Sequence, residues 1–275
     1  MRDGPDRYAV LGNPVGHSKS PRIHGLFAEQ TGQVLSYEAM QVEPGHFASA
    51  AGDFRDQGGR GLNITVPFKE DAWRWVDVLS ERAQRAGAVN TIVFEPDGAS
   101  LGDNTDGVGL VTDLVRNHGV GIRGRRILVL GAGGAVRGVL QPLMVQEPEH
   151  VVLANRTAAR ALKLAQDFRG LGKIQGGGFQ AITGLRFDLI INGTSAGLQG
   201  SVPPLEDDVL AVGGVCYDMV YGDQPTAFVR WGWAHDAAKA LDGLGMLVEQ
   251  AAESFQLWRG VRPETDSVIQ TLRAG

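Results

Sequence analysis

Three polar clusters in the first part of the sequence carry side chains that could act on a small polar substrate. They are Ser18-Lys19-Ser20, the segment from Asn63 to Lys69, and Asn104-Thr105-Asp106-Gly107. Such loops follow short apolar runs typical of strands, and sites assemble at strand ends. Their hydroxyl and amide groups are suited to binding hydroxyls and carboxylates. Lys69 and Asp106 could together transfer a proton at a carbonyl undergoing reduction.

A neighbouring carboxylate favours charged lysine, so Lys69 would donate a proton in reduction and would need desolvation to act as a base in the reverse direction. Each residue also has a purely structural explanation. Ser20, before Pro21, could cap a helix, Asp106 could cap the helix that follows it, and Lys69 could be a solvated residue at a helix start. Taken one at a time, these structural roles are the more common ones.

A second candidate site is the glycine-rich segment Gly131-Ala132-Gly133-Gly134-Ala135, which follows the apolar run 126–130 and opens a helix-like segment. Glycines there permit a tight turn and let backbone N–H groups approach a pyrophosphate at the positive end of a helix. Val136 stands where the G-x-G-x-x-G pattern has its third glycine. The loop alone is therefore a weak signal of a dinucleotide site.

Two arginines indicate which dinucleotide this loop would bind. NAD-binding units carry an acidic residue near the end of the second strand, where it bonds the ribose 2′-hydroxyl. Here that place reads Asn155-Arg156-Thr157, with Arg160 one helical turn later. Guanidinium groups bind phosphate in a fork, so the sequence favours NADPH over NAD. The alternative is that both arginines only solvate the start of a helix.

Short apolar runs alternate with helix-like segments along the chain, which is typical of an α/β protein with mainly parallel strands. The first block has predicted strands at 8–12, 35–42, 62–66 and 89–94, and helices from Ser20, from Pro44 and over 107–118. The second block has predicted strands at 126–130, 151–154, 187–191 and 215–219, with a helix from about Gly134. A helix over 247–258 follows the last strand, so we expect it to return to the first block.

Composition excludes several classes of protein. The chain has 275 residues, 43% hydrophobic and 21% charged, as in soluble globular proteins. A net charge of −5 without a long basic run predicts no nucleic-acid or membrane partner. Cys216 is the only cysteine, which excludes an intrachain disulfide and a Cys-pair zinc site and fits a cytoplasmic location. The H-E-x-x-H and Tyr-x-x-x-Lys motifs are absent.

Taken in order along the chain, these segments resemble the shikimate dehydrogenase family. In the first block the resemblance rests on residues 12–21 (GNPVGHSKSP), 63–69 (NITVPFK), 87–91 (GAVNT) and 104–107 (NTDG). In the second it rests on the Gly131 loop, 155–157 (NRT), 192–197 (NGTSAG), 217–221 (YDMVY) and 242–250 (DGLGMLVEQ). The resemblance covers nearly the whole chain, and the set of motifs is highly specific.

The resemblance implies an NADP-dependent oxidoreductase that reversibly reduces 3-dehydroshikimate to shikimate in chorismate and aromatic amino-acid biosynthesis. It implies two domains: a substrate-binding α/β domain of residues 1–107 plus 245–275, and a Rossmann-type NADP-binding domain of residues 108–244 with a parallel sheet. It makes Lys69 and Asp106 the catalytic pair and implies no metal. The implied substrate contacts are Ser18, Ser20, Thr65, Asn90, Asp106, Tyr221 and Gln250. The implied cofactor contacts are Glu81, Gly131, Ala132, Gly133, Gly134, Ala135, Asn155, Arg156, Thr157, Arg160, Met219 and Gly243.

Two places depart from the family's pattern: residues 222–226 look shorter and reordered, and Gly193 stands where alanine is frequent. Two other functions stay open. One is a paralogue that also accepts quinate or uses NAD, against which Arg156 and Arg160 weigh. The other is a nucleotide-binding sensor without turnover, against which Lys69 and Asp106 weigh. The expected partner is a small molecule, and the expected assembly is a monomer or a homodimer.

Overall fold

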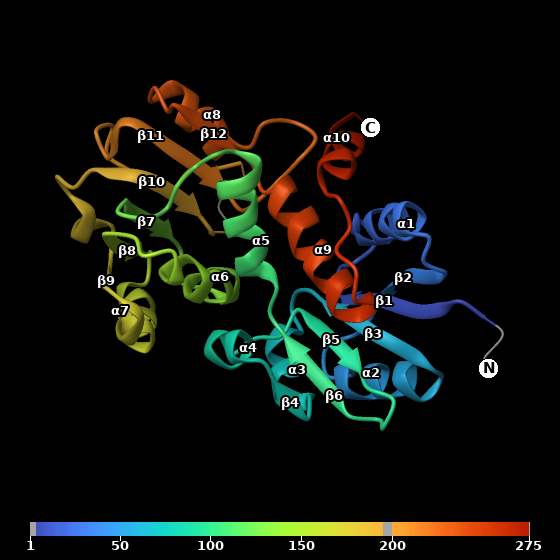
Figure 1. Ribbon diagram of the computed structural model, residues 1–275. Helices are drawn as coiled ribbons and strands as arrows, with labels where there is room; N and C mark the ends of the chain where they lie inside the picture. Colours follow the sequence, from blue (N-terminus) through green and yellow to red (C-terminus); the bar gives the residue numbers. More distant parts are fainter. Residues whose placement is uncertain (1–3, 195–199, 275) are drawn as a thin grey trace. The chain divides into compact units, whose positions relative to one another are not determined.

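The computed structural model describes residues 4–194 and 200–274, which form two compact α/β units (Figure 1). The first unit comprises Met1–Gly109 and Val248–Gly275, and the second comprises Leu110–Leu247. The chain passes from one unit to the other within α5 (Asp106–Thr112) and again within α9 (Leu244–Arg259). Ser195, Ala196 and Gly197 of the segment 192–197 lie outside the described residues.

The sheet of the first unit is mixed and has the strand order β2-β1-β3-β5-β6-β4. β1 (Asp6–Gly12) runs parallel to β2 (Leu35–Gln41) and to β3 (Gly59–Ile64). β5 (Thr91–Phe94) and β6 (Ser100–Asp103) form an antiparallel hairpin, and the edge strand β4 (Val78–Leu79) pairs with β6. The sequence analysis predicts no strand between 94 and the helix that starts at 107, so it misses β6.

Helices cover both faces of the first sheet. On one face, Phe47 and Phe54 of α2 (Phe47–Asp56) and Ala72 of α3 (Lys69–Trp75) pack with Leu11 and Leu62 of the central strands. On the other face, α1 (Ser20–Thr31) and α9 bring together a group of aromatic rings. Its members are Tyr8, His24, Phe27, Tyr37, Phe255 and Trp258. The short α4 (Glu81–Ala86) and α10 (Asp266–Ala274) complete the unit.

The sheet of the second unit is entirely parallel among the described strands, in the order β12-β11-β10-β7-β8-β9. In chain order its strands are β7 (Arg126–Leu130), β8 (His150–Ala154), β9 (Ile174–Gly177), β10 (Phe187–Asn192), β11 (Leu210–Asp218) and β12 (Lys239–Leu241). Numbered within the unit, this is the 3-2-1-4-5-6 order of a Rossmann dinucleotide-binding fold. The predicted α/β fold with a parallel Rossmann-type sheet is therefore confirmed.

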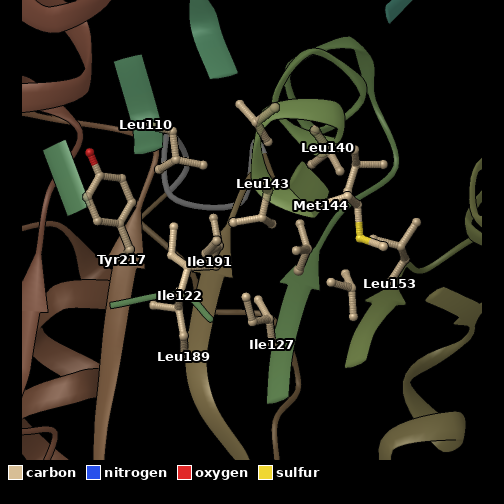
Figure 2. Packing of buried hydrophobic residues seen from close by; sticks show 14 of the residues in the cluster. Leu110, Ile122, Ile127, Leu140, Leu143, Met144, Leu153, Leu189, Ile191 and Tyr217 are labelled. Atoms are coloured by element: carbon tan, nitrogen blue, oxygen red, sulfur yellow. The ribbon is translucent and has the colours of Figure 1, made fainter. Parts of the chain in front are cut away.

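The strands at the centre of the second sheet are held by a dry core (Figure 2). Ile127 of β7 and Leu189 and Ile191 of β10 pack against Leu140 and Leu143 of α6 (Gly134–Val145), and all five are fully buried. Each such side chain contributes about 1.5–3 kcal/mol of burial free energy. The ends of β7 and β10 are consequently fixed in position. α7 (Ala158–Phe168) and α8 (Ala227–Ala234) are the other helices of this unit, with a π-helical turn at Asp113–Asn117.

Candidate active site

Lys69 and Asp106 form the centre of the candidate site in the first unit. Each is the first residue of a helix, Lys69 in α3 after β3 and Asp106 in α5 after β6. Lys69 Nζ donates to Asp106 Oδ2 at 2.6 Å. Their side chains are 22% and 10% exposed, so the pair is shielded from bulk water yet still accessible. The structure thus brings together the two residues that the sequence singled out for proton transfer.

Asn90 occupies the other oxygen of the same carboxylate. Its Nδ2 donates to Asp106 Oδ1 at 2.8 Å and to Thr105 Oγ1 at 2.9 Å. Its Oδ1 accepts from the backbone N–H of Thr105 at 2.9 Å. A backbone N–H can only donate, so this contact fixes which way the Asn90 amide points. Asp106 therefore accepts from Lys69 on one oxygen and from Asn90 on the other.

Gln250 comes to this cluster from α9. Its Oε1 lies 3.3 Å from Asn90 Nδ2 and 3.4 Å from Thr105 Oγ1. The neighbouring Glu249 is fully buried and accepts from Arg262 at 2.8 Å and from Thr265 at 2.6 Å. These contacts fix the part of α9 that belongs to the first unit and so place Gln250 beside Asn90.

Ser18, Ser20 and Thr65 lie in the loops after β1 and β3 or at the helix start that follows. The two loops are joined, because Thr65 N donates to Leu11 O and Asn13 N to Val66 O, both at 2.9 Å. Ser20 is buried and is the first residue of α1, while Lys19 holds the cap position without a side-chain cap bond. Ser20 is thus not the helix cap that the structural explanation assigned to it. Instead, Ser18 Oγ accepts from Ser20 N at 3.2 Å.

Several polar residues without an assigned role in the sequence analysis connect to this cluster. Asn63 and Thr105 belong to the polar segments that the sequence singled out, whereas Tyr37, Arg82, Thr91, Asp103 and Ser254 were given no role. Arg82 forms two hydrogen bonds with Asp103, at 2.7 and 2.6 Å, and thereby ties α4 to the end of β6. One signal was available for Ser254: it lies four residues after Gln250, on the same face of a helix.

The glycine loop of the second unit follows β7 as predicted. Gly131 has φ +108°, and a Cβ atom there would lie 3.1 Å from Gly193 O at the end of β10. These two strands are where the strand order reverses, which is where open α/β sheets bind their ligands. Ala132 is half-buried, whereas Gly133, Gly134 and Ala135 are exposed at the N-terminus of α6. The loop therefore presents exposed backbone groups at the N-terminus of α6.

Val136, at the third glycine position of this loop, fits against Gly193 at the end of β10. A Cβ atom at Gly193 would lie 2.5 Å from Val136 Cγ2 and 3.0 Å from Met219 Sδ. The valine at the third glycine position thus occupies the space beside a residue that has no side chain. Met219 in turn contacts Gly243, where a Cβ atom would lie 2.4 Å from the Met219 carbonyl oxygen. The structure therefore brings together Met219 and Gly243, both implied cofactor contacts.

Arg156 and Arg160 flank the N-terminus of α7, after β8. Both are exposed, and neither guanidinium has a hydrogen bond or an ion pair with any residue that the structure describes. Asn155 Nδ2 donates to Thr157 O at 3.0 Å and so shapes the turn before the helix. Unpaired guanidinium groups at a helix N-terminus suit a phosphate.

Two other implied contacts lie elsewhere. Glu81 is in the first unit, where its exposed side chain accepts from Arg85 at 3.3 Å. Tyr221 is in the second unit, and partial burial raises the pKa of its phenol. Within 4–194 and 200–274, no three His, Cys, Asp or Glu side chains are arranged to hold a metal ion. No helix in these ranges is long and apolar enough to cross a membrane.

Comparison with known proteins places the chain in a family. Family models match three parts of it: the shikimate dehydrogenase substrate binding domain at residues 10–92, shikimate/quinate 5-dehydrogenase at 113–197, and the shikimate 5'-dehydrogenase C-terminal domain at 243–273. The shikimate dehydrogenase (NADP(+)) of Alkalilimnicola ehrlichii is 62% identical over 268 residues, which cover 98% of each chain.

Two solved structures are similar over almost the full length. An Ael1 enzyme from Pseudomonas putida has a TM-score of 0.91 and 45% identity, covering 97% of this chain and 98% of that one. Shikimate 5-dehydrogenase from Thermus thermophilus, in complex with NADP(H) and shikimate, has a TM-score of 0.86 and 35% identity, covering 98% of this chain and 99% of that one. The chain belongs to the shikimate dehydrogenase family.

Proposed function

We propose that this protein catalyses the reversible NADPH-dependent reduction of 3-dehydroshikimate to shikimate, a step of chorismate and aromatic amino-acid biosynthesis. The observation that carries the proposal is the pair of Lys69 and Asp106 at 2.6 Å, with Asn90 on the second carboxylate oxygen. A relative that is 62% identical and is named shikimate dehydrogenase (NADP(+)) supports the same substrate and cofactor.

The side chains of the first unit account for the proton that the reaction needs. Reduction of a ketone adds a hydride to carbon, which NADPH supplies when bound, and a proton to oxygen. Lys69 Nζ gives its proton to that oxygen, and Asp106 keeps the ammonium group in place. In the oxidative direction the same nitrogen accepts the proton of the substrate hydroxyl. Ser18, Ser20, Thr65, Asn90, Gln250 and Tyr221 hold the substrate's carboxylate and hydroxyls in this proposal.

The residues of the second unit fit NADP. Gly131 and the exposed start of α6 can receive the pyrophosphate, and the unpaired Arg156 and Arg160 can receive the 2′-phosphate. In this proposal the first unit is the substrate domain and the second is the cofactor domain. Asn155, Thr157, Met219, Gly243 and Glu81 complete the proposed set of cofactor contacts.

The experiment measures NADPH or NADH formation from shikimate or quinate, with NADP⁺ or NAD⁺, in all four combinations. Rapid turnover only with shikimate and NADP⁺ supports the proposal, whereas comparable rates with quinate or NAD⁺ favour the broader paralogue. No turnover in any combination favours the nucleotide-binding sensor. Lys69→Ala should lower kcat far more than it raises KM for shikimate, because the proton is transferred only in the transition state.

Arginine variants test the cofactor separately. Arg156→Ala combined with Arg160→Ala removes charge-assisted contacts worth about 1.5–3 kcal/mol each, so KM for NADP⁺ should rise by about tenfold or more. KM for NAD⁺ should stay unchanged. Arg186→Ala is the matched control, because Arg186 is also exposed but precedes β10 and pairs with Asp208 at 3.1 Å. Equal losses with both dinucleotides would contradict a role at the 2′-phosphate.

We further propose a cytoplasmic location, on the ground that the sequence has a single cysteine, Cys216, which fits a reducing compartment, and its thiol is buried. Burial raises the pKa of that thiol to about 12, which makes it unreactive. The proposed partners are small molecules only, with the assembly a monomer or a homodimer. Light scattering on the purified protein distinguishes these two assemblies.

A further inference from the structure

A row of polar side chains in the first unit leads from the catalytic carboxylate to β2 at the other end of the sheet. Thr91 Oγ1 lies 2.9 Å from Asn90 Oδ1 and 2.7 Å from Ser254 Oγ. Asn63 Nδ2 lies 3.0 Å from Ser254 Oγ, and Asn63 Oδ1 lies 2.7 Å from the Tyr37 hydroxyl. Asn63, Asn90, Thr91 and Ser254 are all buried. The proposed chemistry assigns no role to Tyr37, Thr91 or Ser254.

The contacts determine which atom donates at each step. The Thr105 N–H and the Asp106 carboxylate fix the Asn90 amide, so Asn90 Oδ1 must accept from Thr91 Oγ1. Thr91 has then used its only hydroxyl proton and must accept from Ser254. These steps orient both hydroxyls toward Asp106.

The same reasoning continues beyond Ser254. Its hydroxyl donates to Thr91 at 2.7 Å, a shorter contact than the 3.1 Å to the Gln250 carbonyl oxygen, and it accepts from Asn63 Nδ2, which can only donate. This leaves Asn63 Oδ1 to accept from the hydroxyl of Tyr37. Burial raises the pKa of Tyr37, which keeps the phenol protonated and able to donate. Every hydrogen bond in the row thus donates in one direction, from Tyr37 to Asp106.

We propose that Tyr37 and Ser254 are positioning residues for the catalytic pair. They act through Asn63, Thr91 and Asn90 and, together with the Thr105 N–H, hold the Asn90 amide in the orientation that donates to Asp106. The inference rests on the proposed function, since it concerns the same reaction. Without the Tyr37 hydroxyl, Asn63 Oδ1 loses its donor at 2.7 Å, and only the contacts of Nδ2 with Asn90 O at 3.2 Å, Thr91 Oγ1 at 3.2 Å and Ser254 Oγ at 3.0 Å hold the Asn63 amide. The hydroxyls farther along are then held less firmly in their directions.

The test uses Tyr37→Phe and Ser254→Ala, alone and combined. Each single variant is expected to lower kcat/KM for shikimate by about five- to thirtyfold, the effect of losing one buried hydrogen bond. KM for NADP⁺ should not change. Because Tyr37 acts through Asn63 and Ser254, the double variant should be no worse than the less active single variant.

Tyr8→Phe is the matched control. Tyr8 is also a buried tyrosine of the same aromatic group, stacked on Trp258 at 4.6 Å, but its hydroxyl contacts Arg259 and not the row. This variant should keep wild-type kcat/KM for shikimate, and adding it to Ser254→Ala should leave the loss caused by Ser254→Ala unchanged. Equal losses from Tyr8→Phe and Tyr37→Phe would mean that Tyr37 serves stability alone.

A second pair of variants covers the case in which Ser254→Ala does not fold. Thr91→Val keeps the shape of the side chain but removes the donor to Asn90, whereas Thr91→Ser keeps the hydroxyl. Activity should fall in the first variant and be retained in the second. The inference would be overturned if the wild-type enzyme oxidises shikimate and both Tyr37→Phe and Thr91→Val are fully active. A wild-type protein without this activity would refute the proposed function instead.

Discussion

His24 is a buried histidine whose charge state is set by its surroundings. Its ring lies 4.3 Å from the ring of Tyr37, nearly parallel to it, and also contacts Phe27, Phe255 and Trp258. Neither ring nitrogen has a hydrogen-bond partner among the residues that the structure describes. Burial lowers the pKa of this imidazole from its ordinary value of 6.5 to about 3. His24 is therefore neutral in the folded protein at any pH near neutrality.

This pKa shift makes stability depend on pH. Between pH 6.5 and about 3 the unfolded chain binds one proton more at His24 than the folded protein does. The free energy of unfolding must therefore fall as the pH is lowered through this range. At pH 5 the loss from this one residue is about 2 kcal/mol relative to pH 7. His24→Phe keeps an aromatic ring of similar size and removes the titration.

The assay is urea unfolding at pH 7 and pH 5, followed by tryptophan emission. On going from pH 7 to pH 5, the unfolding free energy of His24→Phe should rise by about 2 kcal/mol relative to that of wild type. Comparing differences cancels the contributions of the other titrating groups. His46→Phe, at an exposed position, should show no such movement. If the difference for His24→Phe is the same at both pH values, the imidazole does not titrate as the buried ring requires.

Two further substitutions test packing and a buried ion pair. Gly193→Ala puts a Cβ atom 2.5 Å from Val136 Cγ2 and should cost about 1–3 kcal/mol of stability, measured as a lower Tm. Adding Val136→Ala should restore most of this stability, because it removes the atom in contact. Arg82→Met leaves the buried Asp103 carboxylate without its partner and should cost about 3–5 kcal/mol in urea unfolding at pH 7. Adding Asp103→Asn should recover part of that loss, because no buried charge then remains unpaired.

The elements that the sequence predicted are those with a strong pattern. The strand predicted over 126–130 coincides with β7, and the helix predicted from about Gly134 coincides with the start of α6. Boundaries were less accurate: the helix predicted from Pro44 begins at Phe47, and the strand predicted over 62–66 ends at Ile64. β4 has two residues and β12 has three, and runs this short show no periodicity that distinguishes a strand from a loop.

The residues of the candidate site also differ in how clearly the sequence indicates them. Lys69 and Asp106 stand at strand ends among other polar residues, so their sequence context already indicates chemistry. Tyr37 and Ser254 lie inside regular elements, where a tyrosine or a serine is an ordinary residue. Ser254 is 191 positions from Asn63, and only the folded chain brings their side chains to 3.0 Å. A hydrogen-bond row assembled over such separations leaves no local pattern in one sequence.

Val136 and Gly193 show that the packing required by a sequence motif can be preserved even where a residue type of the motif is not. The third glycine of a dinucleotide loop lets the helix pack closely against the strands. In this protein Val136 is fully buried at that position, and its Cγ2 points at the backbone of Gly193, which has no side chain to meet it. The missing glycine at one position is thus offset by an additional glycine 57 positions later. The close packing that the pattern requires is preserved, because the two residues share one volume at the point where β7 and β10 end.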